Sequence, residues 1–209
     1  AEYKGKEAGS FGNIAAFSFY ATKNITCGEG GAITTNHRSY VKAAKRFRQH
    51  GRSDMSQYEY EDLGFNYRMT DISAAMLLEQ LKKLDFITKK RIENAEYLSR
   101  ALGKIKGIRV PVVKNGHKHA FHQYTIRIED DFKLSRDELM AYLSKNGIGC
   151  NVYYPRPLHF HKHIKRLGYK SGDFPVAEKL SKQVISLPVH PNLTKEDLNY
   201  ITSTFAELE

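Results

Sequence analysis

A short apolar segment followed by a lysine and a group of glycines constrains the fold of this chain more than any other feature. Residues 13–20 are mainly apolar and aromatic, with Ser18 among them, which is typical of a strand buried on both faces. Lys23 follows this run, and three glycines within residues 28–31 lead into a second predicted strand over 31–35. Because glycine permits positive φ and close backbone approach, the sequence predicts two strands with Lys23 on their connection.

Lys23 has a position that suits covalent chemistry. An amine placed after a buried strand is partly shielded from water, which favours its neutral form, and a neutral amine can attack an aldehyde. Ser18 lies on the incoming strand and offers a hydroxyl that can bind a phosphate. The alternative is a surface lysine in a hairpin-like loop, and the surrounding motifs decide between the two interpretations.

Beyond this segment the periodicity predicts a helix near residues 38–50 and a long helix that opens at Thr70-Asp71. The long helix is apolar nearly all round over 72–81 and amphipathic afterwards. We therefore expect its first part to be buried, its second part to be exposed on one side, and the whole helix to bridge two domains.

From Gly103 onward the pattern changes to short alternating strands and helices, which predicts a second, smaller α/β domain. The predicted strands are 108–113, 120–128, 148–153 and 184–187, and the predicted helices are one capped by Ser135 and Glu138, one near 174–183, and a last one capped by Thr194 and Asp197. The predicted fold class is therefore α/β, with domains at 1–100 and 101–209.

Composition narrows the classes of partner. The 33 Lys and Arg residues exceed the 23 Asp and Glu by 10 positive charges, which can attract anions, but no basic and aromatic pattern typical of RNA-binding sheets is present. No apolar run approaches the ~18 residues of a membrane span. Cys27 and Cys150 are too distant in sequence for a metal cluster, and His161 and His163 have no ligand at suitable spacing. We expect a cytoplasmic protein without metal, membrane or nucleic-acid partners.

The segment 12–31 closely resembles the active-site signature of the DegT/DnrJ/EryC1/StrS family of sugar aminotransferases, a branch of the fold-type-I pyridoxal-phosphate (PLP) enzymes. Further matches follow in the family's order: Arg48-Gln-His50-Gly51, the run 64–71, Gln80-Leu81, Tyr153-Tyr154-Pro155 with Pro157-Leu158-His159, and 187–191. The resemblance covers essentially the whole chain. It implies the latter part of the family's large PLP-binding domain over 1–100 and its small C-terminal domain over 101–209.

By this resemblance Lys23 forms the Schiff base with PLP and then moves the proton at the reacting carbon. Ser18 contacts the cofactor phosphate, and Asn66 reaches the same phosphate across a homodimer interface, although Asn66 also suits a turn before the Thr70 cap. Arg68 approaches the nucleotide or sugar of the substrate. Tyr153 and His159 either line the sugar pocket or serve only in packing.

The implied enzyme is an aminotransferase that passes an amino group from glutamate to a nucleotide-linked keto-sugar, as a homodimer with shared active sites. The family's usual chain is nearly twice as long, and its acidic motif, whose Asp pairs with the PLP ring nitrogen, lies ahead of the lysine. Here no Asp precedes Lys23. One alternative is therefore an inactive fragment that lacks the N-terminal cofactor-binding half, and another is a related cyclitol or small-ketone aminotransferase.

Overall fold

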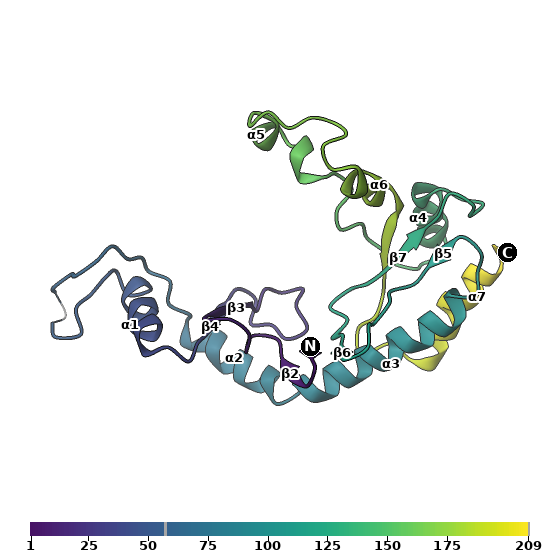
Figure 1. Ribbon diagram of the computed structural model, residues 1–209. Helices are drawn as coiled ribbons and strands as arrows, with labels where there is room; N and C mark the ends of the chain where they lie inside the picture. The colour runs from purple at the N-terminus through teal and green to yellow at the C-terminus, as the bar shows by residue number, and fades with distance from the viewer. Residues whose placement is uncertain (57, 209) are drawn as a thin grey trace. The chain divides into compact units, whose positions relative to one another are not determined.

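A computed structural model of the chain describes residues 1–56 and 58–208 as a mixed α/β structure (Figure 1). It divides into two compact units: Ala1–Ile87 with Val113–His119, and Thr88–Val112 with the chain from Ala120 onward. The division falls inside helix α3 (Leu84–Leu102). The domain limits at 1–100 and 101–209 stay predictions.

A small three-stranded sheet opens the first unit. Strands β1 (Glu2–Tyr3) and β2 (Lys6–Glu7) form a hairpin, and β6 (His117–Lys118) pairs with the other edge of β1, all antiparallel. The Lys118 ammonium lies 2.6 Å from the Glu2 carboxylate across the sheet. Two-residue strands leave no alternation in a sequence, so this sheet has no signal that could have predicted it.

Strands β3 (Ala15–Ser18) and β4 (Gly31–Thr34) form an antiparallel pair with Ser18 opposite Gly31, which confirms the two predicted strands and places Lys23 on their connection. The expectation of burial on both faces is wrong here: the exposed fractions of Phe17 and Ile33 are 38% and 53%. The described residues supply only these two strands to the sheet, and a two-stranded ribbon needs further layers to bury either face.

Helix α1 (Arg38–Phe47) confirms the first predicted helix but ends three residues earlier than the predicted limit at residue 50. Helix α2 (Asp71–Leu81) begins at the predicted N-cap, where the Thr70 hydroxyl accepts a hydrogen bond from the amide of Ser73 at 3.2 Å. The helix therefore begins at the residue that the side-chain chemistry of its N-cap indicates.

The single long helix predicted after Thr70 is two helices. The amide of Lys83 bonds to the carbonyl of Gln80, three residues back, so a tight turn separates α2 from α3. The burial predicted for the first part is wrong, whereas the second part is exposed on one side, as predicted. Within α2 only Leu77 is buried and Ile72 is 77% exposed, whereas α3 buries Leu98 completely. An all-round apolar helix indicates burial only where neighbouring elements cover it.

The second unit contains the larger core. Its antiparallel sheet has the order β5-β7-β8, formed by Ile108–Arg109, Tyr124–Ile128 and Val184–Leu187. Every second residue of β7 is buried, as expected for a strand with one face in a core. Buried residues from the sheet and from helices α3, α4 and α7 form one cluster, among them Leu98, Ile126, Leu139, Ile185 and Phe205.

Three predicted helices of this unit are confirmed: α4 (Arg136–Lys145), α6 (Pro175–Gln183) and α7 (Lys195–Ala206). Both predicted capping boxes are present, at Ser135 with Glu138 and at Thr194 with Asp197. Two short elements without a sequence prediction, η1 (Leu158–Phe160) and α5 (Lys162–Lys165), precede α6. Among the described residues no helix combines the length and the apolar character that crossing a membrane requires.

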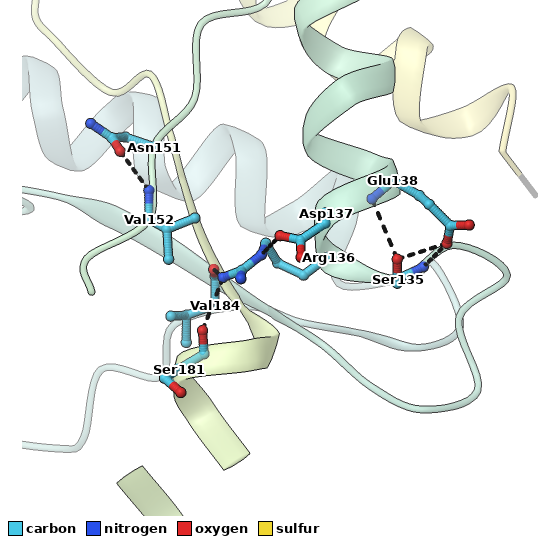
Figure 2. A network of polar contacts seen from close by, with 8 residues as sticks. All are labelled: Ser135, Arg136, Asp137, Glu138, Asn151, Val152, Ser181 and Val184. Carbon is cyan, nitrogen blue, oxygen red and sulfur yellow. Dashed lines mark hydrogen bonds and ion pairs between the residues drawn. The ribbon is translucent and has the colours of Figure 1, made fainter. Parts of the chain in front are cut away.

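The strand predicted over 148–153 is wrong, because only Asn151 makes a β-bridge, to Ser186. The side-chain oxygen of Asn151 accepts a hydrogen bond from the amide of Val152 at 2.8 Å (Figure 2). Asparagine side chains compete with strand pairing in this way. The backbone therefore leaves the sheet directly after a single bridge.

A buried arginine connects α4 to the end of α6 (Figure 2). Arg136 is 8% exposed, and its guanidinium donates to the carbonyls of Ser181 and Val184 at 3.0 and 3.2 Å. Its Nε donates to the Asp137 carboxylate at 2.5 Å. Carbonyls in the last turn of a helix lack partners within the helix, so the guanidinium satisfies them and is satisfied in return.

Candidate active site

The connection that carries Lys23 is held by hydrogen bonds to the end of β3. The carbonyl of Phe19 accepts from the amide of Cys27 at 3.1 Å and from the hydroxyl of Thr26 at 2.9 Å. The amide of Phe19 donates to the carbonyl of Gly30 at 2.8 Å. This connection is therefore a folded loop with defined backbone geometry.

Lys23 and Ser18 lie at the same end of the β3–β4 hairpin. Lys23 is half-buried, and its amide donates to the carbonyl of Tyr20 at 2.9 Å. Ser18 is exposed, and its hydroxyl accepts from the amide of Tyr20 at 3.3 Å. The structure thus brings the predicted amine and the predicted phosphate-binding hydroxyl into one local segment.

An apolar cluster, which we call the hairpin cluster, anchors this loop. It consists of the buried residues Phe19, Ile25, Cys27, Leu77 and Ile87, with Met69 packed against them. Met69 directly follows Arg68, so the segment 66–68 and the Lys23 loop are anchored to the same side chains. Cys27 is 4% exposed and unbridged, so it packs as a small buried side chain beside the loop.

The segment that carries Asn66 and Arg68 runs along the end of α1. The amide of Phe65 donates to the carbonyl of Phe47 at 2.7 Å, and Asn66 pairs with Gln49 in a β-bridge. The guanidinium of Arg68 donates to the side-chain carbonyl of Gln49 at 2.9 Å. Asn66 and Arg68 are both exposed, so they can reach a ligand or a partner chain.

Two glycines permit this approach of the backbones. A Cβ on Gly64 would lie 2.1 Å from the amide nitrogen of Gly51, and one on Gly51 would lie 1.7 Å from the carbonyl oxygen of Asp62. Gly51 also has a φ of +75°. Both glycines belong to motifs that the sequence analysis noted, but their function as a backbone contact was not predicted.

Tyr153 belongs to the second unit and lines a hollow of about 360 Å³ there, together with Arg91, Cys150 and His190. Its hydroxyl accepts from the side-chain amide of Asn151 at 3.2 Å, and its exposed fraction is 39%. A substrate-binding role for Tyr153 stays a prediction.

His159 also belongs to the second unit but is buried, with 5% exposed, against the rings of Phe160 and Phe174. Its Nε2 lies 2.9 Å from the Glu178 carboxylate. Desolvation acts to raise the pKa of Glu178, but hydrogen bonds from the amide of Gly172 and from His159 outweigh it, so that pKa lies below its usual range. These contacts show that His159 is packed against neighbouring side chains. Its contact with a sugar stays a prediction.

Sequence reasoning did not single out Arg91. It lies on the buried face of α3 in line with Ile87 and Leu98, and only 8% of it is exposed. Its guanidinium donates to the carbonyl of Phe121 at 3.1 Å, and burial lowers its pKa. Its helical spacing from Ile87 and Leu98 was a sequence signal that Arg91 lies on the buried face of the helix.

In the described part of the chain, no three His, Cys, Asp or Glu side chains lie close enough together to hold an ion. The rings of His161 and His163 are 6.1 Å apart. The half-buried thiol of Cys150 is unbridged, and its burial raises its pKa.

Comparison with known proteins gives consistent matches over the whole chain. The sequence pattern of the DegT/DnrJ/EryC1/StrS aminotransferase family matches residues 1–206. The chain is 34% identical to the dTDP-3-amino-3,4,6-trideoxy-alpha-D-glucose transaminase of Streptomyces venezuelae over 197 residues, which are 93% of this chain and 50% of that protein.

Solved structures agree with this result. The structure of DesV from S. venezuelae in complex with a ketimine intermediate matches with a TM-score of 0.91 and 31% identity, covering 99% of this chain and 54% of that one. A putative sugar aminotransferase from Streptococcus pneumoniae in its PLP form gives a TM-score of 0.89 at 28% identity, covering 99% and 54%. The α/β fold class is therefore confirmed, and the chain spans about half the length of the curated relatives it matches.

Proposed function

The chain belongs to the DegT/DnrJ/EryC1/StrS aminotransferase family, and from this premise we propose that it carries the C-terminal portion of a PLP-dependent sugar aminotransferase with Lys23 as the Schiff-base residue. The observation that carries the proposal is the position of Lys23, which is half-buried on the folded loop that follows the strand carrying Ser18. A nucleotide-linked keto-sugar as acceptor is supported by the dTDP-sugar transaminase among the relatives. Glutamate as donor rests on the family resemblance.

The functional groups of these residues are of the types that bind PLP. A primary amine suits its aldehyde, and hydroxyl and amide groups suit its phosphate; Lys23, Ser18 and Asn66 offer these groups on segments that share the hairpin cluster. When bound, PLP supplies an electron sink for the carbon that exchanges the amino group. The Lys23 amine would move the proton between that carbon and the C4′ carbon of the cofactor, while Ser18 and Asn66 would hold the phosphate in place.

The remaining roles follow the same assignment. Asn66 would act across a homodimer interface, Arg68 would bind the nucleotide or sugar, and Tyr153 and His159 would line the sugar pocket. The exposed apolar residues of α2, including Ile72 and Leu78, support a covering partner for the first unit. Because the chain spans about half the length of its relatives, we propose that turnover needs residues that correspond to their other half.

The proposal is tested by mixing the chain with PLP, reducing with borohydride and locating the pyridoxyl group by peptide mass spectrometry. We expect the adduct on the peptide that contains Lys23 and its loss in Lys23→Ala. Lys104→Ala, which alters an exposed lysine in the second unit, is the matched control. An adduct spread over several lysines, unchanged by Lys23→Ala, would favour the inactive-fragment alternative for the chain alone.

The substrate class needs a separate test with an active protein that contains this chain together with residues corresponding to the other half of its relatives. Nucleotide-linked keto-sugars and free cyclitol ketones are compared as amino acceptors. Turnover of the free ketones alone would contradict the nucleotide-sugar proposal and favour the cyclitol alternative.

A further inference from the structure

The chain contains two Asn-Gly pairs, and the structure holds them in opposite ways. Asn115-Gly116 lies in the turn that leads into β6, and Asn146-Gly147 follows α4, with Asn146 as the C-cap. A lysine precedes each pair, so the two are closely matched in local sequence. We propose that Asn115 is a site of spontaneous deamidation, which turns its side chain into a carboxylate and releases β6 from the sheet of the first unit.

The reaction requires water and no enzyme or cofactor. The main-chain nitrogen of Gly116 attacks the side-chain carbonyl carbon of Asn115, and the side-chain amine leaves as ammonia together with the proton of the Gly116 amide. Water then opens the cyclic imide. Opening at the side-chain carbonyl gives aspartate, and opening at the main-chain carbonyl gives isoaspartate, whose main chain runs through the side-chain carbon. Glycine in the attacking position favours ring closure because it has no side chain to obstruct it.

The pair at Asn115 is arranged so that the two reacting groups can meet. Asn115 and Gly116 are both exposed to water. The amide of His117 donates to the carbonyl of Lys114 at 3.0 Å, which closes a turn around the pair, and Gly116 has a φ of +75° at its third position. Within the described residues, neither the Asn115 side chain nor the Gly116 amide has a hydrogen-bond partner. Ring closure therefore breaks no bond within the protein.

The pair at Asn146 is restrained at each of the groups that would react. The Asn146 side-chain amide donates to the carbonyl of Tyr142 at 2.9 Å, and the Gly147 amide donates to the carbonyl of Ser144 at 3.0 Å. The main-chain carbonyl of Asn146 also accepts from the hydroxyl of Tyr200 at 3.0 Å. The Gly147 nitrogen cannot reach the side-chain carbonyl until some of these bonds break.

Turn preference explains why the residues are present but does not distinguish the two pairs. Asn and Gly are favoured in turns, and glycine with positive φ is favoured after a helix end, where Gly147 has a φ of +72°. Both pairs satisfy these preferences equally. The difference between them lies in the hydrogen bonds of the folded chain.

The position of Asn115 gives its modification a structural consequence. The carbonyl of Gly116 accepts from the amide of Lys4 at 2.6 Å, next to the pairing of β6 with β1. Residues 113–119 belong to the first unit, whereas the chain on either side of them belongs to the second. Isoaspartate lengthens the main chain in this turn, so it displaces the Gly116 carbonyl and weakens the pairing of β6 with β1. Aspartate adds a negative charge and leaves the main chain unchanged.

Incubation of the whole chain at mildly alkaline pH, followed by peptide mass spectrometry, tests the proposal. In the folded chain, Asn115 should deamidate at least roughly tenfold faster than Asn146, because hydrogen bonds of ordinary strength hold the second pair. In the chain unfolded by denaturant the two rates should become similar. Asn115→Gln should remove the modification from this turn, and the matched control Asn146→Gln should leave the rate at Asn115 unchanged. Equal rates in the folded chain, or a faster rate at Asn146, overturn the proposal.

Hydrogen exchange tests the consequence for β6. Isoaspartate is identified in the aged chain by electron-transfer fragmentation, and exchange is read in the peptides that contain Lys4 and β6. We expect faster exchange in the isoaspartate form than in Asn115→Asp, which carries the same charge on an unaltered main chain. Equal exchange in these two forms would overturn the release of β6. Neither measurement involves PLP or Lys23, so this inference and the proposed function fail independently.

Discussion

The two units use apolar residues in opposite ways. The second unit collects its leucines, isoleucines and phenylalanines into one core, where Leu98 and Phe205 are fully buried. The first unit has a hairpin cluster of five buried residues and leaves α2 largely exposed, with Leu78 at 61%. The same kind of apolar pattern thus produces a self-sufficient core in one unit and an uncovered surface in the other.

The largest expected difference comes from the same substitution in both units. Leu98→Ala should destabilise the second unit by about 2–5 kcal/mol, because it removes buried methyl groups and leaves a cavity. Leu78→Ala should change stability by less than about 0.5 kcal/mol, because that side chain is already in solvent. Hydrogen exchange read separately for peptides of each unit measures both effects. A large effect of Leu78→Ala would show that α2 is covered in solution.

A smaller effect, local to the first unit, is expected at the glycine contact. Gly64→Ala should cost about 1–3 kcal/mol of local stability, because its Cβ would overlap the backbone of Gly51. Faster hydrogen exchange and proteolysis of the segment that carries Asn66 and Arg68 would report the loss. Gly149→Ala is the control in the second unit, since a Cβ there has no atom within 4 Å. Unchanged exchange in Gly64→Ala would show that the two segments do not touch.

The sequence predicted local features well and burial unevenly, for physical reasons. Caps such as Thr194 with Asp197 are determined by side chains within four residues, so they can be read directly. The burial of Ile72 or Phe17 depends on which other elements cover them, and no local pattern contains that information.

The candidate site divides in the same way. The loop position of Lys23 follows from the strands on either side of it, and the structure confirms it. The contact of Gly51 with Gly64 arises from segments that meet only in the folded chain. Spacing along the sequence therefore cannot reveal it.

The helix caps offer a third comparison, with effects near 1 kcal/mol. Thr194→Ala removes a hydroxyl that accepts from the amide of Asp197 at 3.1 Å and breaks a complete capping box, so a loss of about 1 kcal/mol is expected. Thr70→Ala removes a hydroxyl that accepts from the amide of Ser73 at 3.2 Å and donates to the Ser73 hydroxyl at 3.0 Å, without the reciprocal bond of a capping box, and should cost less. Thermal unfolding by circular dichroism and exchange of the first turns measure the two losses. A greater loss for Thr70→Ala would contradict the ranking of the two helix starts.

The smallest expected effect is a difference in how the two units respond to acid and salt. The pKa of Glu178 is lowered because its hydrogen bonds outweigh desolvation, and the pKa of Glu79 is lowered by a hydrogen bond and attraction from Lys82. A lowered folded pKa means that each carboxylate contributes stability above its unfolded pKa, near 4.5, and loses it as pH falls through the folded value.

Exposure separates the two carboxylates. The side chain of Glu79 is 67% exposed, so salt should screen its interaction, whereas that of Glu178 is 17% exposed and partnered largely by neutral donors. Glu178→Gln should therefore flatten the acid dependence of the second unit at low and at high salt alike, and Glu79→Gln should do so for the first unit only at low salt. Hydrogen exchange across the acid range at two salt concentrations measures this. If salt abolished the Glu178 effect, its hydrogen bonds with the amide of Gly172 and with His159 would be exposed to solvent. That result would contradict the burial of Glu178 in the second unit.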